Sequence, residues 1–371
     1  MEARRTTGKQ NDFHRSQSRP RRTQLKVPCM SSEVINELQF STQPLCRMDD
    51  YVTSIDFSFD GRFVGAASVS GEASVHGLDG NGIVFAAHTG DTTRIRFSPT
   101  AHEFATGGID GAVRIWNHSG VLIAEEVRKG WCNDIAWRPT GGEVAGVVGR
   151  SVVRVLSNGL NGMKHQELDA TGECVGWNSD GRRLFVGAYG GVLMFQSDAR
   201  AIRDYPWKGA PLVVRISPDD KWIATGNQDS SLHCWKVSNG SDLQMTGFET
   251  KVQHIAWNES SRYLANASFD VISLWDFSGK GPKGSRPIEL TGHTGRIVGI
   301  GYLKTAPEIL VSAATDGAVC LWRPTAKGRS LIARNDTHLA LSALAISPQS
   351  STVAVGTEDG EVFLLDVAGI E

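Results

Sequence analysis

One short pattern recurs eight times along this chain of 371 residues and limits what it can fold into. In each copy, alternating apolar residues lead to an apolar or aromatic anchor, and a polar turn such as Ser-Pro or Asp-Gly follows. Neighbouring anchors are 39 to 45 residues apart, a period typical of repeat proteins. The eight anchors are Phe57, Phe97, Trp137, Trp177, Ile216, Trp257, Tyr302 and Ile346.

A second bulky marker follows each anchor by about 20 residues, at the end of another apolar-alternating stretch. Each period therefore holds four short β-strands, and no helical periodicity persists for ten residues in the body of the chain. A single four-stranded unit cannot bury both of its faces, whereas a closed ring of such units can. The pattern predicts an all-β chain that forms a closed propeller of eight four-stranded blades. The markers are His76, Trp116, Leu156, Phe195, Trp235, Trp275, Trp322 and Leu365.

The two ends of the repeat array complement each other. The last unit ends soon after its third strand, and its fourth, outer strand is missing. Residues 33–42, which precede the first unit, read as a strand that belongs to no complete repeat. We expect this segment to complete the last blade, because pairing the two ends removes two exposed strand edges.

Charge divides the chain into two expected regions. Residues 1–30 hold eight Lys and Arg against two Asp and Glu, so the remaining residues carry a net charge of −8. We expect 1–30 to be a basic, disordered tail and 31–371 to be one propeller domain. The tail could instead be an arm for nucleic acid or nuclear import, a transit peptide, or a segment upstream of a true start at Met30.

Other site classes lack support in the sequence. No stretch of 18 apolar residues is present, which excludes a membrane-spanning helix. The six cysteines are scattered and form no Cys-x-x-Cys pair, so we expect reduced thiols and a cytoplasmic protein. The run from Gly279 to Gly284 matches Gly-x-Gly-x-x-Gly, but Pro282 interrupts it and no helix follows. We predict no catalytic residues, no cofactor and no metal ion.

The repeats resemble the WD40-repeat family over roughly residues 31–371. The Trp-Asp pair survives at Trp275-Asp276 and the Gly-His pair at Gly292-His293. The resemblance implies a buried His, Ser/Thr, Asp and Trp hydrogen-bond tetrad in two repeats, while repeat five has Trp207 in place of the histidine. The tetrads are His88, Thr106, Asp110 and Trp116 in repeat two, and His293, Ser312, Asp316 and Trp322 in repeat seven.

The resemblance also implies a partner-binding face on the side of the ring that carries the tetrad turns. Side chains on that face come from positions six and four residues before an anchor, and from the residue before the turn aspartate. Large aromatic residues and both signs of charge occur among them. The candidates are Tyr51, Asp91, Trp131, Asn133, Glu173, Gln228, Lys251, Gln253, Phe269, Arg296 and Glu358.

These features predict a non-catalytic scaffold that binds a protein or peptide and is monomeric within a larger complex. We expect Tyr51, Asp91 and Trp131 to form one patch suited to a partner that carries Arg or Lys. The alternative is a chromatin- or RNA-associated propeller that uses the basic tail, with nuclear localisation. A propeller enzyme is the third reading, and nothing in the sequence converges on such chemistry.

Overall fold

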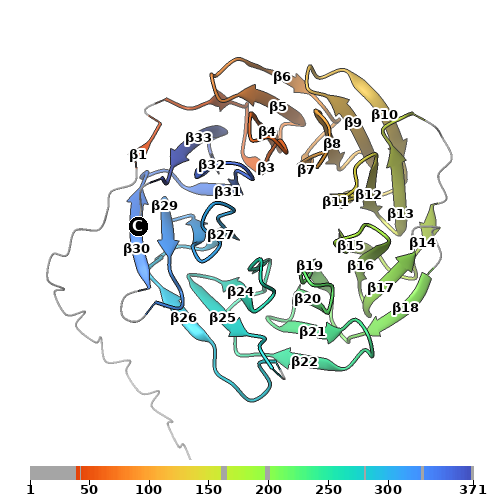
Figure 1. The fold of residues 1–371 in the computed structure, drawn as a ribbon. Coiled ribbons are helices and arrows are strands. Elements are labelled where there is room, and N and C mark those ends of the chain that lie inside the picture. Colours follow the sequence, from red (N-terminus) through yellow and green to blue (C-terminus); the bar gives the residue numbers. More distant parts are fainter. Residues whose placement is uncertain are drawn as a thin grey trace, which may run out of the picture. The chain divides into compact units, whose positions relative to one another are not determined.

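The computed structural model describes residues 39–41, 43–159, 165–196, 201–279, 281–326 and 330–368. Within these ranges every regular element is a β-strand, and the strands form eight antiparallel sheets arranged as a ring (Figure 1). The predicted all-β class and the predicted eight-bladed propeller are confirmed. The expected tail at 1–30 lies outside the described residues.

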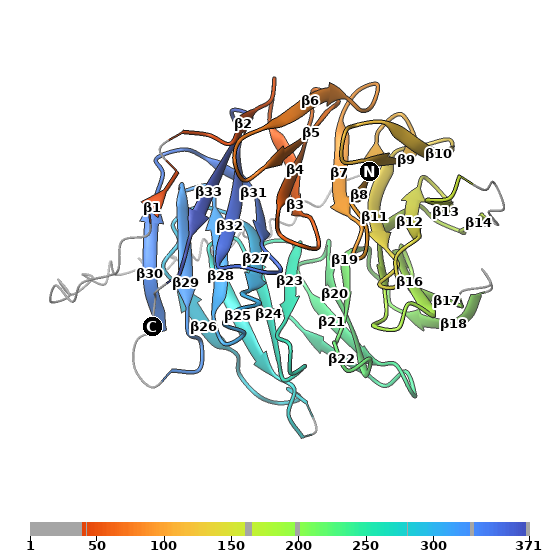
Figure 2. The same cartoon turned by 45° about the horizontal axis from the view of Figure 1, so that its top comes forward.

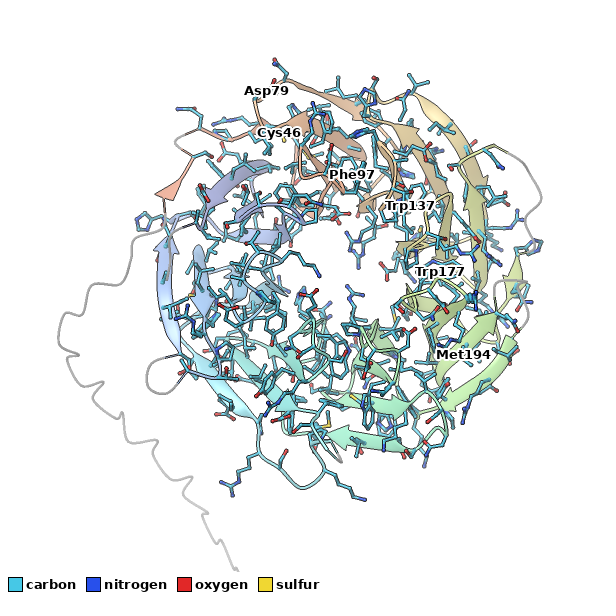
Figure 3. The ribbon with its side chains drawn as sticks, in the orientation of Figure 1. Cys46, Asp79, Phe97, Trp137, Trp177 and Met194 are labelled. Atoms are coloured by element: carbon cyan, nitrogen blue, oxygen red, sulfur yellow. The ribbon has the colours of Figure 1, made fainter. Side chains whose placement is uncertain are left out.

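The innermost strands surround the centre of the ring, and each contacts the innermost strand of both neighbouring blades. All eight anchors are the last residues of these strands, and Phe97, Trp137 and Trp177 mark three consecutive blades in Figure 3. The equal spacing of the anchors thus reflects one structural position repeated around the ring. The innermost strands are β3 (Val52–Phe57), β7 (Thr92–Phe97), β11 (Cys132–Trp137), β15 (Gly172–Trp177), β19 (Pro211–Ile216), β23 (His254–Trp257), β27 (Ile297–Tyr302) and β31 (Leu341–Ile346).

The second and third strands of each blade are the most buried, because neighbouring blades cover both of their faces. The second strands are β4 (Phe63–Ser68), β8 (Glu103–Gly108), β12 (Glu143–Val148), β16 (Arg183–Ala188), β20 (Trp222–Asn227), β24 (Tyr263–Ser268), β28 (Leu310–Ala314) and β32 (Thr352–Thr357). The third strands hold the eight bulky markers. They are β5 (Glu72–Gly77), β9 (Ala112–Asn117), β13 (Ser151–Leu156), β17 (Gly191–Gln196), β21 (Leu232–Lys236), β25 (Val271–Asp276), β29 (Ala318–Trp322) and β33 (Glu361–Asp366).

The outer strands lie at the rim, as the tilted view in Figure 2 shows. Their residues alternate between half-buried and exposed along much of their length, which is typical of a strand with one solvated face. The outer strands of blades one to seven are β6 (Gly82–Ala86), β10 (Leu122–Val127), β14 (Gln166–Glu167), β18 (Ala201–Pro206), β22 (Asp242–Met245), β26 (Ile288–Thr291) and β30 (Leu331–Asp336).

Blade eight is completed from the other end of the chain. Two short strands, β1 (Gln39–Phe40) and β2 (Cys46–Arg47), both pair antiparallel with β33. We expected one outer strand at 33–42, of which residues 33–38 and 42 lie outside the described residues. The paired segment extends further, to residue 47, and it is interrupted around Pro44, which has no N–H to donate to the ladder.

The hydrophobic core lies between blades rather than at the centre of the ring. Between blades one and two, for example, Ile95, Phe97 and Phe104 pack against Ala67 and Val75. The closing segment joins this scheme, since Cys46 and Met48 are buried with residues of blades one and eight. Each blade interface is therefore a separate apolar layer, and the ring needs all eight of them.

Candidate interaction face

Blade two contains a continuous chain of side-chain hydrogen bonds. The indole Nε1 of Trp116 donates to Thr106 Oγ1 at 2.9 Å, and that hydroxyl lies 2.7 Å from His88 Nε2. His88 Nδ1 lies 2.8 Å from Asp110 Oδ1. When Thr106 donates to Nε2, the neutral imidazole donates from Nδ1 to Asp110, and Arg114 Nη1, which lies 2.7 Å from Nδ1, donates to the other oxygen of Asp110. The chain therefore holds the loop before β7 against the turn between β8 and β9.

The electrostatic surroundings keep His88 and Asp110 each in one protonation state. Burial lowers the pKa of His88, and Asp110 only partly offsets that effect, so the imidazole is neutral at pH 7. Burial raises the pKa of Asp110, but hydrogen bonds from Arg114 and His88 outweigh it and hold the pKa well below its usual range. A carboxylate beside a neutral imidazole is the arrangement that fixes one histidine tautomer.

Blade seven repeats the same chain. Trp322 Nε1 donates to Ser312 Oγ at 2.8 Å, and Ser312 Oγ lies 2.7 Å from His293 Nε2. His293 Nδ1 lies 3.3 Å from Asp316 Oδ1, a longer contact than in blade two. Asp316 also accepts from the backbone N–H groups of Thr294 at 2.8 Å and Ala318 at 3.1 Å. The aspartate therefore fastens two loops at once.

In blades five and six, other contacts form at the positions of the tetrad. In blade five the ring of Trp207 packs on His233 with centroids 4.1 Å apart, and His233 Nε2 lies 3.0 Å from Asp242 Oδ2. In blade six Trp275 Nε1 donates to Asn266 Oδ1 at 2.9 Å. In blade five the stacked Trp207 takes the place of the tetrad histidine, and in blade six the Asn266 amide takes the place of the Ser/Thr hydroxyl, so neither blade has the full tetrad.

The tetrad turns and the beginnings of the innermost strands share one face of the ring. In an antiparallel blade, the first strand begins on the side where the second strand ends, and the tetrad aspartates lie in the turn after that second strand. Candidates from both positions are thereby brought to the same face. We call this side of the ring the tetrad face.

Trp131 is the most exposed aromatic residue among the sequence candidates, with 65% of its surface accessible. Its backbone oxygen accepts from Gly149 N, and Gly149 O in turn accepts from Gly172 N. Gly172 pairs with Ala188, and the next residue, Tyr189, is 69% exposed. Neighbouring blades three and four therefore both present an exposed aromatic ring on the tetrad face.

The sequence analysis missed Tyr189. It occupies the position before the turn aspartate, but blade four has Gly190 where an aspartate would mark the turn. The strand pairing aligns Tyr189 with Ile109 of blade two. Counting the residues between the anchor and the marker in repeat four could have found it.

A small cavity of about 190 Å³ lies beside Tyr189. Leu168, Val192 and Tyr205 contribute apolar surface to its wall. Asp169 and Asp204 also line it, and neither makes an ion pair within the part of the chain that the structure describes. The cavity is therefore apolar inside with two free carboxylates on its wall.

Tyr51 belongs to a different group of candidates from Trp131. Burial raises the pKa of its phenol, Arg296 lowers it and Glu358 raises it, which places all three side chains in one electrostatic neighbourhood. Arg296 and Glu358 are exposed, and Tyr51 and Asp91 are half-buried. The mouth of the channel near blades one, seven and eight therefore carries this cluster.

The other candidates have mixed surroundings. Asn133 Nδ2 donates to Gly172 O at 2.8 Å, which ties it to the next blade. Burial raises the pKa of Glu173. Phe269 is exposed with a positive φ of 52°, and Gln253 lines the central channel. Gln228 and Lys251 are exposed.

Reactive groups are scarce among the described residues. Five cysteines there are free and buried, and burial raises the pKa of Cys320 to about 12, so its thiol is inert at neutral pH. No group of three or more His, Cys, Asp or Glu side chains within the described ranges could hold a metal ion. The same ranges contain no helix long and apolar enough to cross a bilayer.

Parts of this chain are similar in sequence to known repeat proteins. The family model for the WD domain, G-beta repeat matches residues 82–117 and 209–236. The chain is 26% identical to WD repeat-containing protein 1 of Bos taurus over 47% of this chain and 29% of that protein. It is 24% identical to pre-mRNA-splicing factor cwf17 of Schizosaccharomyces pombe, over 48% of this chain and 52% of that protein.

A further relative and one solved structure are also similar to this chain. THO complex subunit 3 of Arabidopsis thaliana is 29% identical over 33% of this chain and 38% of that protein. In each of these relatives, the match covers less than two thirds of the relative's length. The crystal structure of the computationally designed Ika8 protein superposes with a TM-score of 0.73 at 17% identity, over 89% of this chain and all of that one. This likeness concerns the fold alone.

Proposed function

We propose that this chain, which is an eight-bladed WD40-repeat β-propeller, is a non-catalytic scaffold that binds a protein or peptide through its tetrad face. The observation that carries the proposal is the pair of exposed aromatic rings, Trp131 and Tyr189, on neighbouring blades. Neither ring is needed to fill its own blade, and exposed aromatic residues are favoured centres of binding energy. WD40 propellers generally bind proteins or peptides, which agrees with this role.

The surroundings of the two rings suggest the chemistry of the partner. The cavity beside Tyr189 has the size for a single apolar side chain, and Asp169 and Asp204 carry free negative charge on its wall. An extended peptide with an apolar residue next to Lys or Arg would satisfy both features. The cation could also rest on the face of Trp131 or Tyr189. We therefore propose a basic, partly apolar peptide segment as the ligand of this patch.

The test compares what the intact protein and a double variant recover from a cell extract. Trp131→Ala with Tyr189→Ala should lose the partner that the wild-type chain retains, with affinity reduced about thirtyfold or more. Its unfolding midpoint should stay near the wild-type value, since both rings are exposed.

The matched control removes exposed apolar surface at the rim instead, through Leu122→Ala with Ile288→Ala. This control should recover the partner normally. Equal recovery by both double variants would refute the proposed site.

The leading proposal goes with a cytoplasmic location, and the alternative proposal is a nuclear, RNA-associated role. The alternative is supported by the basic composition of residues 1–30, together with relatives named as a splicing factor and a THO complex subunit. Under this alternative, the intact chain should bind RNA with an affinity that falls steeply with salt, and deleting residues 1–30 should abolish binding. RNA binding that survives the deletion would place the site elsewhere.

A further inference from the structure

The central channel contains a cavity of about 230 Å³ that the proposed protein contacts do not use. This space is many times the roughly 10–15 Å³ that one water molecule needs. Part of the wall is polar and comes from blades one, two, three, five and six, while Ile300 and Leu344 line the side of blades seven and eight. Figure 3 shows nitrogen-tipped side chains projecting into the open centre of the ring.

Three arginines from two blades dominate the charge of the wall. Arg94 and Arg96 come from β7, and Arg215 comes from β19 across the channel. Asp134 is the carboxylate that lines the same cavity. It is already engaged, since Arg94 Nε donates to it at 3.2 Å and the Val175 N–H donates to its other oxygen at 3.2 Å.

Arg96 and Arg215 have no carboxylate within 4 Å among the described residues. Arg96 donates to Ser54 Oγ at 2.9 Å and to the Ile95 carbonyl at 2.8 Å. Arg215 donates to the Val214 carbonyl at 2.9 Å and is otherwise open to the solvent of the channel. Each guanidinium has five N–H donors, so most donors of both groups are free to bind an acceptor.

The neighbouring titratable groups do not neutralise this cluster. Burial lowers the pKa of His254 to about 4, with Arg94, Arg215 and Arg296 adding to the effect, so the imidazole is neutral at pH 7. Asp56 faces Arg96, but it accepts backbone N–H groups of Phe57 at 3.0 Å and Phe97 at 2.8 Å. The wall of the cavity therefore keeps a net positive charge, because Asp134 offsets only one of the three guanidinium groups.

We propose that the channel binds a small phosphate-class oxyanion, such as inorganic phosphate or a short polyphosphate, between Arg96 and Arg215 with Arg94 beside them. Planar guanidinium groups match the oxygen geometry of a phosphoryl group and bind it through paired hydrogen bonds. Arg96 and Arg215 line a space that is large enough, and the net charge of the wall favours an anion. Arg296 at the mouth adds positive potential along the approach.

The test measures thermal unfolding of the full chain by tryptophan fluorescence at constant ionic strength. Phosphate, pyrophosphate and tripolyphosphate are compared with chloride. Binding should raise the midpoint with increasing anion concentration, as linkage requires, and calorimetry gives the affinity. A midpoint that moves no more in any of these anions than in chloride would overturn the proposal.

Arg215→Gln identifies the site. Without anion, this variant should be at least as stable as the wild type, because it relieves repulsion between like charges. With phosphate, its affinity should fall about tenfold or more, since it loses a charged donor group. Arg96→Gln should behave in the same way, and it replaces the first variant if Arg215→Gln fails to fold. The matched control is Arg182→Gln, at an exposed arginine in the turn between β15 and β16.

The control must keep the wild-type response. If Arg182→Gln and Arg215→Gln lose the response equally, or if neither loses it, the anion binds elsewhere and the proposal is wrong. A second readout is independent of stability, because bound anion should raise the pKa of His254 in a proton NMR titration. An unchanged pKa of His254 in saturating phosphate would also refute the site.

Discussion

Replacing Asp316 with alanine should destabilise the propeller. Asp316 accepts two backbone N–H groups, from Thr294 and Ala318, and lies 3.3 Å from His293 Nδ1. Only 7% of its side chain is exposed, so water replaces these acceptors poorly. Leaving buried donors without a partner costs about 1–3 kcal/mol, and that is the expected loss of unfolding free energy.

The assay is equilibrium unfolding in urea, followed by tryptophan fluorescence and by circular dichroism. Asp204→Ala is the control, because Asp204 is exposed on β18 and makes no ion pair within the described ranges. A double-mutant cycle with His293→Ala should show coupling of at least about 0.5 kcal/mol, since the two side chains act in one chain of hydrogen bonds.

The effect has a definite pH dependence. Burial raises the pKa of Asp316, but hydrogen bonds from Thr294 and Ala318 and the contact with His293 outweigh it, so the folded-state pKa is below the ordinary value of about 3.9. A group of this kind contributes its full stability above the unfolded pKa and loses it as pH falls through the folded pKa. The gap between wild type and Asp316→Ala should therefore persist down to pH 4 and shrink below it. A variant as stable as the wild type at pH 7 would refute the role assigned to Asp316.

Three further predictions test the ring and its turns. A chain that begins at residue 48 should lose stability and cooperativity relative to one that begins at residue 39, because β1 and β2 are removed; equal urea midpoints would argue against closure by these strands. The thermal unfolding midpoint should fall between pH 7 and pH 5, because burial lowers the pKa of five histidines, namely His76, His88, His233, His254 and His293. A group with a depressed pKa loses its contribution to stability as the pH drops below its unfolded-state pKa, which is about 6.5 for histidine. His254→Gln should flatten this pH profile, and a flat wild-type profile would contradict the prediction. Gly71→Ala should cost more stability than Gly80→Ala, because both positions have a positive φ of 89° and 84° but only at Gly71 would the new methyl carbon lie 2.6 Å from the His88 carbonyl oxygen; equal losses in thermal unfolding would show that strain alone decides.

Repetition made the fold predictable from the sequence. Anchors such as Phe57 and Trp137 end the innermost strand of every blade, so eight independent signals predicted one position of the fold. The interruption of the closing strand by Pro44 was harder to foresee, because that segment occurs once and has no second copy to align with. The register of the closing segment depends on which residues of β33 are left unpaired, and this is determined by the tertiary fold rather than by the local sequence.

The candidate site was less accessible to the sequence. Trp131 was found through its distance from an anchor, whereas Tyr189 lies in a turn without an aspartate and was recognised through the pairing of β15 with β16. Tyr51 is at the equivalent position to Trp131, yet its electrostatic neighbours are Arg296 and Glu358. Arg96 and Arg215 come from different repeats, and only ring closure brings them to one channel. Spacing along the chain predicts a position within a blade, but not what faces it across the ring.

Closure by the N-terminal segment also sets the timing of folding during synthesis. Leu364 donates its N–H to Ser41 Oγ across 323 positions of sequence, so this contact cannot form until almost the whole chain has been made. At about 5–20 residues per second, the ribosome needs on the order of 15–65 s to translate that interval. During this time blade one exposes the apolar face that blade eight later covers, and the closing segment has an unpaired strand edge. A nascent chain is therefore most open to capture by chaperones, or to pairing with another copy, just before its last strand appears.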